Sequence, residues 1–571
     1  MSLVPSPTTP VSSAGADPAI RPRRRRLIGP VTRAQGVDRG LGISAGWILG
    51  VVVLGTAWLL PGTAWSAGLG WTAAPLMAYA LCSGRGYRAA YCAGVIGHII
   101  GFHWVYRTVA VFGGFGPAAA SLVFALFVGL GALQFLAIAA IAHHLGRVFD
   151  ALALRSATAV VLAELLTPRL FPWHFGHTQI AFTPFAQVAA VGGTMAVSFL
   201  MFWLAEAVIR VVVFRERRLN FLIPVAMFGL SIVYGLAMMV RYGPPRGQQQ
   251  EVVGAQGHIA NAERRDLQLA RQYLGRIFEL SRRAAHPGSL VIWPEGAIPA
   301  YLPAAIGTVG DPPVLPWTGD GSAYLVGAYS FLPNEEKFNT AFAVYPDGEV
   351  PLPYFKRVLI PFGEYMPMAS YIPWLKALNA RAGAFGSGTE TKVFAYPMRR
   401  PDGSQYTLNV SPLICYEDTV PSLSREAARK GAELLVNLTS DAWFGRSLAP
   451  HQHHVIAAFR AIENRRFLVR STTTGLSAVV DPLGRTVARI APFSEGTITA
   501  TVSLLADATP YTTWVGDRPW WALLATAAGL AIGRRARAGG PDRPTRRRPG
   551  RTLPTRSRSP TTARRPRWGS S

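Results

Sequence analysis

Three side chains that together suit acyl transfer stand in the order Glu295, Lys356, Cys415, about 60 residues apart. A cysteine thiolate is a strong nucleophile, although an unperturbed thiol supplies little of it near neutral pH. A carboxylate can take the thiol proton as general base. An ammonium group favours the thiolate and then stabilises the oxyanion of a tetrahedral intermediate. These residue types predict covalent, nucleophilic chemistry at a carbonyl carbon.

Each of the three lies beside a turn or at the end of an apolar run. Glu295 follows the run 289–293 within Trp-Pro-Glu-Gly, Lys356 lies in Tyr-Phe-Lys-Arg, and Cys415 lies between Leu-Ile and Tyr-Glu-Asp. Strand ends of this kind project side chains into a shared cleft at one edge of a sheet. A lone Cys is more often a small core residue, so the prediction rests on all three local patterns together.

The segment 241–514 must position these residues, and its pattern is that of an α/β layered domain. Short apolar runs alternate in it with polar stretches of helical character. The predicted strands are 289–293, 323–327, 340–345 and 433–437, and the predicted helices are 261–284 and 453–464. Its length suffices for a sizeable core.

The segment 44–240 is predicted to form a bundle of about seven membrane helices. Half of the chain is hydrophobic and only 15% is charged, whereas about a quarter of an ordinary soluble domain is charged. Several of the apolar segments reach the ~20 residues that a bilayer-spanning helix requires. They are 44–60, 62–82, 89–112, 117–142, 152–167, 184–213 and 219–240, and a last helix is predicted over 515–533.

The net charge of +26 is concentrated at the two ends of the chain. Seven Arg fall in residues 1–40 and thirteen in 534–571, so 1–43 and 534–571 are predicted to be disordered and basic. Loops that would share the side of the N-terminus carry seven Arg, and the opposite short loops carry only Arg107 and Arg169. This asymmetry predicts cytoplasmic termini and an extracytoplasmic 241–514 domain. Nucleic-acid binding is not expected, because no recognition motif accompanies the charge.

Two other assignments fit this layout less well. A transporter would explain the intramembrane Glu164 and Glu206. However, the sequence shows no repeat of segments, and a transporter does not explain the long polar insertion. The three cysteines have no metal-ligand spacing, and the run 451–454, His-Gln-His-His, is more simply a solvated helix start than a metal site.

The Glu–Lys–Cys order and its contexts resemble the nitrilase (carbon–nitrogen hydrolase) superfamily. Further motifs narrow the resemblance to bacterial apolipoprotein N-acyltransferases, over roughly residues 44–533. They are Phe171-Pro-Trp173 with Gly176-His-Thr-Gln179, Gly192-Gly193 with Ser198-Phe199, Pro361-Phe-Gly-Glu-Tyr365, Cys415-Tyr-Glu417, Asp441-Ala-Trp-Phe-Gly445, and Arg470-Ser-Thr with Gly475. The layout of seven helices, a catalytic domain and one last helix is also similar to that family.

The resemblance implies a nitrilase-like α-β-β-α sandwich inserted in a multi-span helical membrane bundle. It implies transfer of an acyl chain from a membrane phospholipid to the N-terminal amine of the diacylglyceryl-Cys of an apolipoprotein, through a Cys thioester and without cofactor or metal. The expected roles are nucleophile for Cys415, general base for Glu295 and third triad member for Lys356. Supporting roles are implied for Glu364, Tyr416 and Glu417.

The same resemblance places the protein in the cytoplasmic membrane and leaves one alternative open. That alternative is a membrane-tethered amidase of the nitrilase type with water as acceptor, since the same triad serves both reactions. Ser440, Thr473 and His451 depart from the family pattern, which commonly has Asn, Asn and Trp there. None of these departures removes a triad member.

Loops rich in Gly, Pro and aromatic residues are predicted to wall a lipid-accessible cleft around the triad. They are 299–316, 361–388 and 443–454. Such walls would shield a thioester from water. Apolar side chains at their tips are expected to contact acyl chains or membrane, namely Phe362, Trp374, Phe385 and Phe444.

Overall fold

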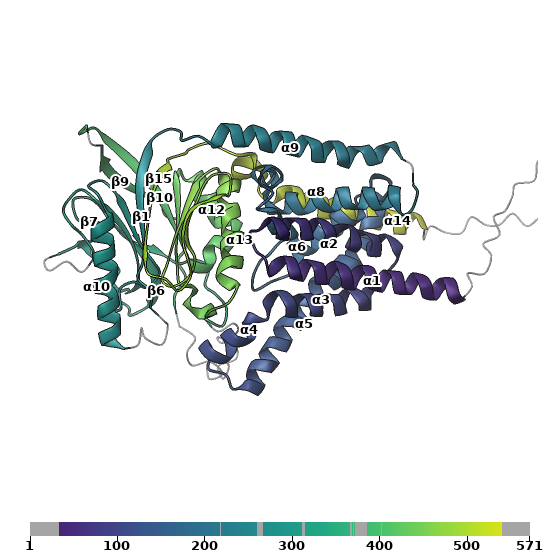
Figure 1. The fold of residues 1–571 in the computed structure, drawn as a ribbon, viewed down its shortest axis with the longest axis horizontal. Coiled ribbons are helices and arrows are strands. Elements are labelled where there is room, and N and C mark those ends of the chain that lie inside the picture. The colour runs from purple at the N-terminus through teal and green to yellow at the C-terminus, as the bar shows by residue number, and fades with distance from the viewer. Residues whose placement is uncertain are drawn as a thin grey trace, which may run out of the picture.

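The computed structural model describes residues 33–216, 218–259, 266–310, 315–365, 368, 371, 385–400 and 402–538. Within them, a bundle of long helices packs end-on against an α/β domain (Figure 1). The described chain begins and ends at the end of the bundle that points away from the α/β domain (Figure 1). The predicted division into a helical half and an α/β half therefore agrees with the fold.

Among the described residues, the bundle has nine α-helices before the α/β domain and one after it. Their bounds are α1 Arg33–Trp58, α2 Ala64–Ser83, α3 Tyr87–Phe102, α4 Trp104–Arg107, α5 Pro117–His144, α6 Arg155–Leu166, α7 Thr183–Ala186, α8 Ala189–Val212, α9 Leu222–Tyr242 and α14 Arg518–Ala538. A π-helical turn, 108–112, continues α4. Helix α1 starts inside the stretch 1–43 that was predicted to be disordered, and the rest of that stretch lies outside the described residues.

Four helices of the described chain, α1, α5, α8 and α9, are long and apolar enough to cross a membrane. A fifth span results if α3 and the α4 segment, bent by 60° at their junction, count as one. Helix α6 has 12 residues and so rises only about 18 Å, against a hydrocarbon core of about 30 Å. Within the described residues, each of the eight predicted apolar segments contains a helix. That all eight cross the membrane remains a prediction.

In the described residues, the α/β domain holds two main sheets that face each other, each with a continuous path of six strands. One sheet runs β15-β1-β2-β5-β6-β8 with β3 on β5, the other runs β14-β13-β12-β11-β10-β9, and β4 pairs with β7. The bounds are β1 Gln249–Gln256, β2 Leu290–Trp293, β3 Tyr301–Pro303, β4 Gly307–Thr308, β5 Ala323–Phe331, β6 Lys337–Val344, β7 Glu349–Val350, β8 Tyr354–Phe355, β9 Phe394–Arg399, β10 Gln405–Ile414, β11 Leu434–Thr439, β12 Phe467–Thr472, β13 Ser477–Val480, β14 Thr486–Ile490 and β15 Gly496–Ser503.

Both sheets have a parallel centre, β1-β2-β5 in one and β10-β11-β12 in the other. Parallel strands buried on both faces need apolar residues throughout, and β2 and β11 are buried at every position. Their carboxyl ends meet at one edge, which is where such sheets place functional side chains. All four strands predicted from the sequence are present.

Helices cover the outer face of each sheet, so the predicted α-β-β-α sandwich is confirmed. Helix α10 (Leu267–Ala284) lies on the face away from the bundle, and α12 (Pro421–Arg429) and α13 (Ala449–Asn464) lie between the second sheet and the bundle (Figure 1). One core fills the space between the sheets and another the space under α10. The bundle core continues without a break into α13. The second helix layer is thus buried from both sides.

Candidate active site

Cys415 lies on a tight turn at the carboxyl end of β10. Its φ is +53°, a conformation that costs a non-glycine residue free energy and is concentrated at functional sites. The turn continues as one short 3-10 helix, Cys415–Thr419. The amide of Asn437 on the neighbouring strand β11 donates to the Cys415 carbonyl at 3.0 Å. This geometry lifts the thiol out of the sheet, and Cys415 remains partly exposed.

The first sheet supplies the charged groups that face this turn. Glu295 follows β2 and Lys356 follows β8, and both side chains are buried. The Lys356 ammonium lies 2.7 Å from a Glu364 oxygen and 3.9 Å from Glu295 Oε1. The backbone N–H of Ile360 donates to the same Glu364 oxygen at 2.9 Å. The structure thus brings Glu295, Lys356 and Glu364 together, as the sequence predicted.

Asn339 is a member of this group that sequence reasoning missed. Its side-chain amide donates to Glu295 Oε1 at 2.6 Å and to Glu364 Oε1 at 2.9 Å. The backbone carbonyl of Asn339 accepts a hydrogen bond from the backbone N–H of Lys356 at 2.8 Å. One buried amide therefore holds two carboxylates on either side of the lysine. The available signal was an amide side chain beside Thr340 at the start of a mostly apolar run, 338–344.

Electrostatics in the group keep the lysine charged and the thiol protonated. Burial alone would lower the pKa of Lys356, but Glu364, Cys415 and Glu295 raise it above its ordinary value. Burial raises the pKa of the Cys415 thiol, and Glu295 raises it further while Lys356 opposes the change. The thiolate must therefore form by proton transfer during attack, and a carboxylate is in place to receive the proton.

Glu417 ties the nucleophile turn to the lysine segment. Its buried carboxylate accepts from the N–H of Ile414 at 2.7 Å, of Arg357 at 2.7 Å and of Val358 at 3.1 Å. The Tyr354 hydroxyl also donates to it, at 2.9 Å. The residues just before Cys415 and just after Lys356 are thus joined through one side chain. Burial raises the pKa of Glu417, while these donors and Lys356 lower it.

A buried cluster of four charges lies behind the same turn. The His453 ring contacts Asp418 at 2.7 Å and Asp441 at 3.0 Å through its two nitrogens, and Arg470 pairs with Asp418. Burial alone would lower the pKa of His453, but Asp418 and Asp441 raise it to about 9. Both ring nitrogens face carboxylates, so the imidazolium is the form that fits.

The cluster corrects the expectation of a solvated helix start at 451–454. Gln452, His453 and His454 are all buried, and they lie near the start of α13 between the sheet and the bundle. The charges in this segment are satisfied within the protein rather than by water. Within the described part of the chain, no grouping of three His, Cys, Asp or Glu side chains fits a metal ion.

Two of the three departures from the family pattern contact each other. The hydroxyls of Ser440 and Thr473 lie 2.9 Å apart and are hydrogen-bonded. Both residues lie at the end of the sheet that carries the nucleophile, since Ser440 follows β11 and Thr473 follows β12. A pair of short hydroxyl side chains thus stands where the pattern has two amides.

A narrow apolar pocket runs from the nucleophile turn into the helical bundle. It is lined by Trp58, Phe102, Trp104, Phe171, Trp173, Ile360, Cys415, Tyr416, Thr419, Phe444, Ala449, Gln452, His453 and Ile456. Its free volume is about 30 Å³, which is room for a water molecule or two and too little for an acyl chain. Cys415 and Tyr416 of the nucleophile turn line it together with aromatic rings of the bundle. An acyl chain enters only if side chains of the wall move.

The apolar side chains predicted at the tips of the cleft walls lie in different surroundings. Phe444 lines the pocket, and its ring lies 5.1 Å from Trp104 and 6.2 Å from Phe171. Phe385 stacks on Tyr329 at 5.4 Å, and Phe362 is 58% exposed. Trp374 lies outside the described residues. Contact of these side chains with lipid remains a prediction, which the position of Phe444 supports best.

Comparison with known proteins identifies both halves of the chain. The apolipoprotein N-acyltransferase N-terminal domain matches residues 66–207, and the carbon–nitrogen hydrolase family matches residues 267–511. An apolipoprotein N-acyltransferase of Geobacter metallireducens is 33% identical over 63% of this chain and 69% of its own length. That of Methylococcus capsulatus is 30% identical over 79% and 88%. That of Bdellovibrio bacteriovorus is 29% identical over 86% and 93%.

Solved structures of the nitrilase superfamily are also similar, over about half of the chain. Nit3 of Saccharomyces cerevisiae covers 45% of this chain and 90% of its own at 18% identity, with a TM-score of 0.32. An amidase from Nesterenkonia sp. covers 46% and 93% at 22% identity, also with a TM-score of 0.32. The family assignment rests on the sequence relatives, whose matches extend through bundle and sandwich alike: this chain belongs to the apolipoprotein N-acyltransferase family and is a membrane protein.

Proposed function

We propose that this protein transfers an acyl chain from a membrane phospholipid to the N-terminal amine of the diacylglyceryl-Cys of apolipoproteins, with Cys415 as nucleophile. Family membership supports the reaction. The observation that carries the lipid donor is the apolar pocket that joins Cys415 to Trp58, Phe102 and Trp173 of the bundle. An acyl chain that passed from the bilayer into this pocket would stay in apolar surroundings. It would therefore avoid the free-energy cost of exposing its methylenes to water.

The first step forms a thioester on Cys415. Glu295 takes the thiol proton while the sulfur attacks the ester carbonyl carbon. The Lys356 ammonium, held by Glu364 at 2.7 Å, stabilises the oxyanion of the tetrahedral intermediate. The ester C–O bond then breaks, and Glu295 returns the proton to the oxygen of the departing lysophospholipid. The acyl chain stays on the sulfur.

The second step transfers the chain to the lipoprotein. The N-terminal amine attacks the thioester carbonyl and gives up a proton to Glu295, and the C–S bond breaks as that proton passes to the sulfur. The free Cys415 thiol and an amide are the products. Glu364, Asn339 and Glu417 act as positioning residues in both steps, because their contacts fix Glu295, Lys356 and the nucleophile turn.

The alternative acceptor is water, which would make the protein a membrane-tethered amidase. The triad alone does not separate the two reactions. The narrow pocket favours an acyltransferase, because rings of Trp104, Phe171 and Phe444 pack against one another in its lining and leave little room for water. The two functions differ in what leaves the thioester, free fatty acid or amide.

We place the protein in the cytoplasmic membrane with the α/β domain on the outer side. The loop arginines support this orientation through the positive-inside rule. The described ends of the chain lie together at the far end of the bundle (Figure 1), as two cytoplasmic termini require. The nucleophile would then lie at the level of the outer leaflet, within reach of both lipid substrates.

Mass spectrometry of the purified protein after incubation with a diacyl phospholipid tests the proposal. We expect one acyl group on Cys415, and loss of that group as an amide product when a diacylglyceryl-Cys peptide is added. Cys82 and Cys92 provide internal controls, because both are free thiols outside the pocket lining. No adduct on Cys415 with intact donor would refute the proposal, and release of fatty acid without any amide would establish the hydrolase instead.

A further inference from the structure

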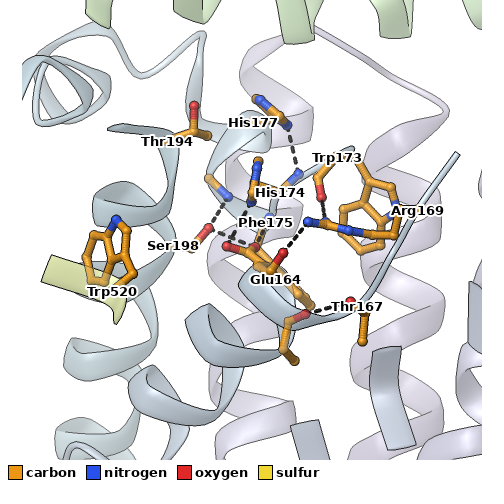
Figure 2. A network of polar contacts seen from close by, with 12 residues as sticks. Glu164, Thr167, Arg169, Trp173, His174, Phe175, His177, Thr194, Ser198 and Trp520 are labelled. Atoms are coloured by element: carbon orange, nitrogen blue, oxygen red, sulfur yellow. Dashed lines mark hydrogen bonds and ion pairs between the residues drawn. The ribbon is translucent and has the colours of Figure 1, made fainter. Parts of the chain in front are cut away.

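Glu164 is a buried carboxylate near the end of α6 that the proposed chemistry does not use. It is 3% exposed in a helix of otherwise apolar character, and buried charges in membrane helices commonly mark functional positions. Figure 2 shows the groups that converge on it. One carboxylate oxygen accepts from the N–H of Phe175 at 2.8 Å and the hydroxyl of Ser198 at 3.0 Å, and the other lies 3.0 Å from His174 Nδ1.

The contacts fix the loop that leaves α6 and turns back beside α8. Three successive backbone N–H groups of this loop bond to side chains rather than to other backbone groups. His174 donates to His177 Nδ1 at 2.8 Å, Phe175 to Glu164, and Gly176 to the Ser198 hydroxyl at 2.8 Å. A polar backbone group left unpaired at such a depth is costly, so these side chains determine where the loop lies.

Arg169 closes the same loop from the other side (Figure 2). Its guanidinium donates to the backbone carbonyl of Glu164 at 2.5 Å and to that of Trp173. The end of α6 and the carbonyl of Trp173 are therefore joined through one side chain. Together with Glu164 and Ser198, this contact leaves the backbone on either side of Trp173 little freedom.

Trp173 is the part of this loop that reaches the pocket. Its ring lies 5.9 Å from Trp58, 6.5 Å from Phe102 and 6.3 Å from Phe135, and it lines the pocket together with Trp58 and Phe102. Phe444, another ring of the lining, lies instead on the short turn 441–444 of the α/β domain. The part of the pocket wall that the bundle supplies thus includes one ring on a loop that side-chain contacts hold in place.

We infer that Glu164 is a positioning residue that holds Trp173 in the aromatic wall of the pocket and thereby sets the length of acyl chain that the enzyme prefers. The inference rests on the proposed function, since it takes the occupant of the pocket to be the donor's acyl chain. A fixed apolar wall discriminates chains that differ by a methylene by about tenfold or more. A wall that moves discriminates less.

Glu164→Leu, Glu164→Gln and Glu206→Leu test the inference in a matched set. Glutamine retains an oxygen that accepts from Phe175 and Ser198, whereas leucine does not. Glu206 is equally buried in the same bundle, but its partners are Arg210 and the N–H of Ser156, and it is outside the pocket lining. The measurement is the rate of Cys415 acylation by phospholipids with a series of acyl-chain lengths.

We expect Glu164→Leu to reduce discrimination between the best donor and one two carbons longer by about tenfold. Glu164→Gln should keep most of that discrimination, and Glu206→Leu should keep it even if the yield of protein falls. Equal loss of rate on every donor in Glu164→Leu, or the same flattening in Glu206→Leu, would overturn the inference. Absence of Cys415 acylation in the unaltered protein is a different result, which removes the proposed function itself.

A second variant covers failure of Glu164→Leu to insert. Ser198→Ala keeps the carboxylate and removes the hydroxyl that bonds to Glu164 and to Gly176. It should flatten the chain-length preference in the same direction, by about threefold because the contacts of Phe175 and His174 with Glu164 remain. An unchanged preference in Ser198→Ala counts against a role for this network in substrate choice.

Discussion

Substitution of His453 by Gln should remove a pH dependence of stability that the buried cluster creates. In the folded protein the pKa of His453 is raised from 6.5 to about 9, because the effects of Asp418 and Asp441 outweigh burial. The unfolded chain takes up the proton only below its ordinary pKa. The charged ring therefore contributes its full stabilisation below pH 6.5, and this contribution is lost as pH rises through about 9.

The size of the effect follows from the shift. One pKa unit corresponds to about 1.36 kcal/mol, so a change from 6.5 to about 9 amounts to roughly 3 kcal/mol. Solvent screening does not reduce it much, since the four side chains are between 0% and 9% exposed. Glu463 also titrates in the folded protein, with a pKa that burial raises to about 7, so it contributes to the pH dependence at the lower end of this interval. The contribution of His453 is therefore the difference between the slope of the unaltered protein and the slope of a variant without the ring.

Thermal unfolding in detergent at several pH values measures this contribution. The unaltered protein should lose several degrees of Tm between pH 7 and 9, and His453→Gln should start lower and lose clearly less over that interval. His454→Gln is the matched control, since burial holds the pKa of His454 well below 6.5 and the ring bonds to a neutral partner, Thr486. A slope in His453→Gln equal to that of the unaltered protein would refute the reasoning.

Three further predictions concern the triad and the topology. Glu295→Gln and Lys356→Met should each slow acyl-enzyme formation by at least about two orders of magnitude in single-turnover mass spectrometry, and a wild-type rate in Glu295→Gln would remove that residue as the base. Asn339→Leu, similar in shape, should slow the same step about tenfold or more through loss of two hydrogen bonds to carboxylates, whereas an unchanged rate means that other contacts position them. A reporter active only outside the membrane should work when fused after residue 250 and fail after residue 540; the opposite pattern would reverse the orientation.

The sequence was most informative where chemistry follows local pattern. Glu295 and Cys415 stand directly after apolar strands, so the edge at which they meet could be predicted before the fold was known. Asn339 lies inside a strand, and nothing local indicates that its amide bridges carboxylates contributed by segments on either side of it in the sequence. His453 belongs to a cluster with Asp418, Asp441 and Arg470. Only the packing of α13 on the second sheet brings these side chains together.

The pocket was the least predictable feature, because its walls come from opposite ends of the chain. Trp104 and Gln452 are 348 residues apart and share a hydrogen bond of 2.9 Å. The number of membrane spans was also uncertain from hydropathy alone. Helix α6 has only 12 residues, and the loop after it turns back into the bundle, held by Glu164. A window of apolar residues does not distinguish the two arrangements.

The contacts between bundle and sandwich indicate that the nucleophile is fixed relative to the membrane rather than carried on a mobile tether. The Gln452 amide donates to the carbonyls of Trp58 and Gly101 at 2.9 Å each. Glu463 accepts from the N–H and hydroxyl of Thr194, where α8 is kinked at the preceding glycines. These polar groups are buried, so separation of the two halves would leave them unpaired at considerable cost. Both substrates must therefore come to a site of fixed height.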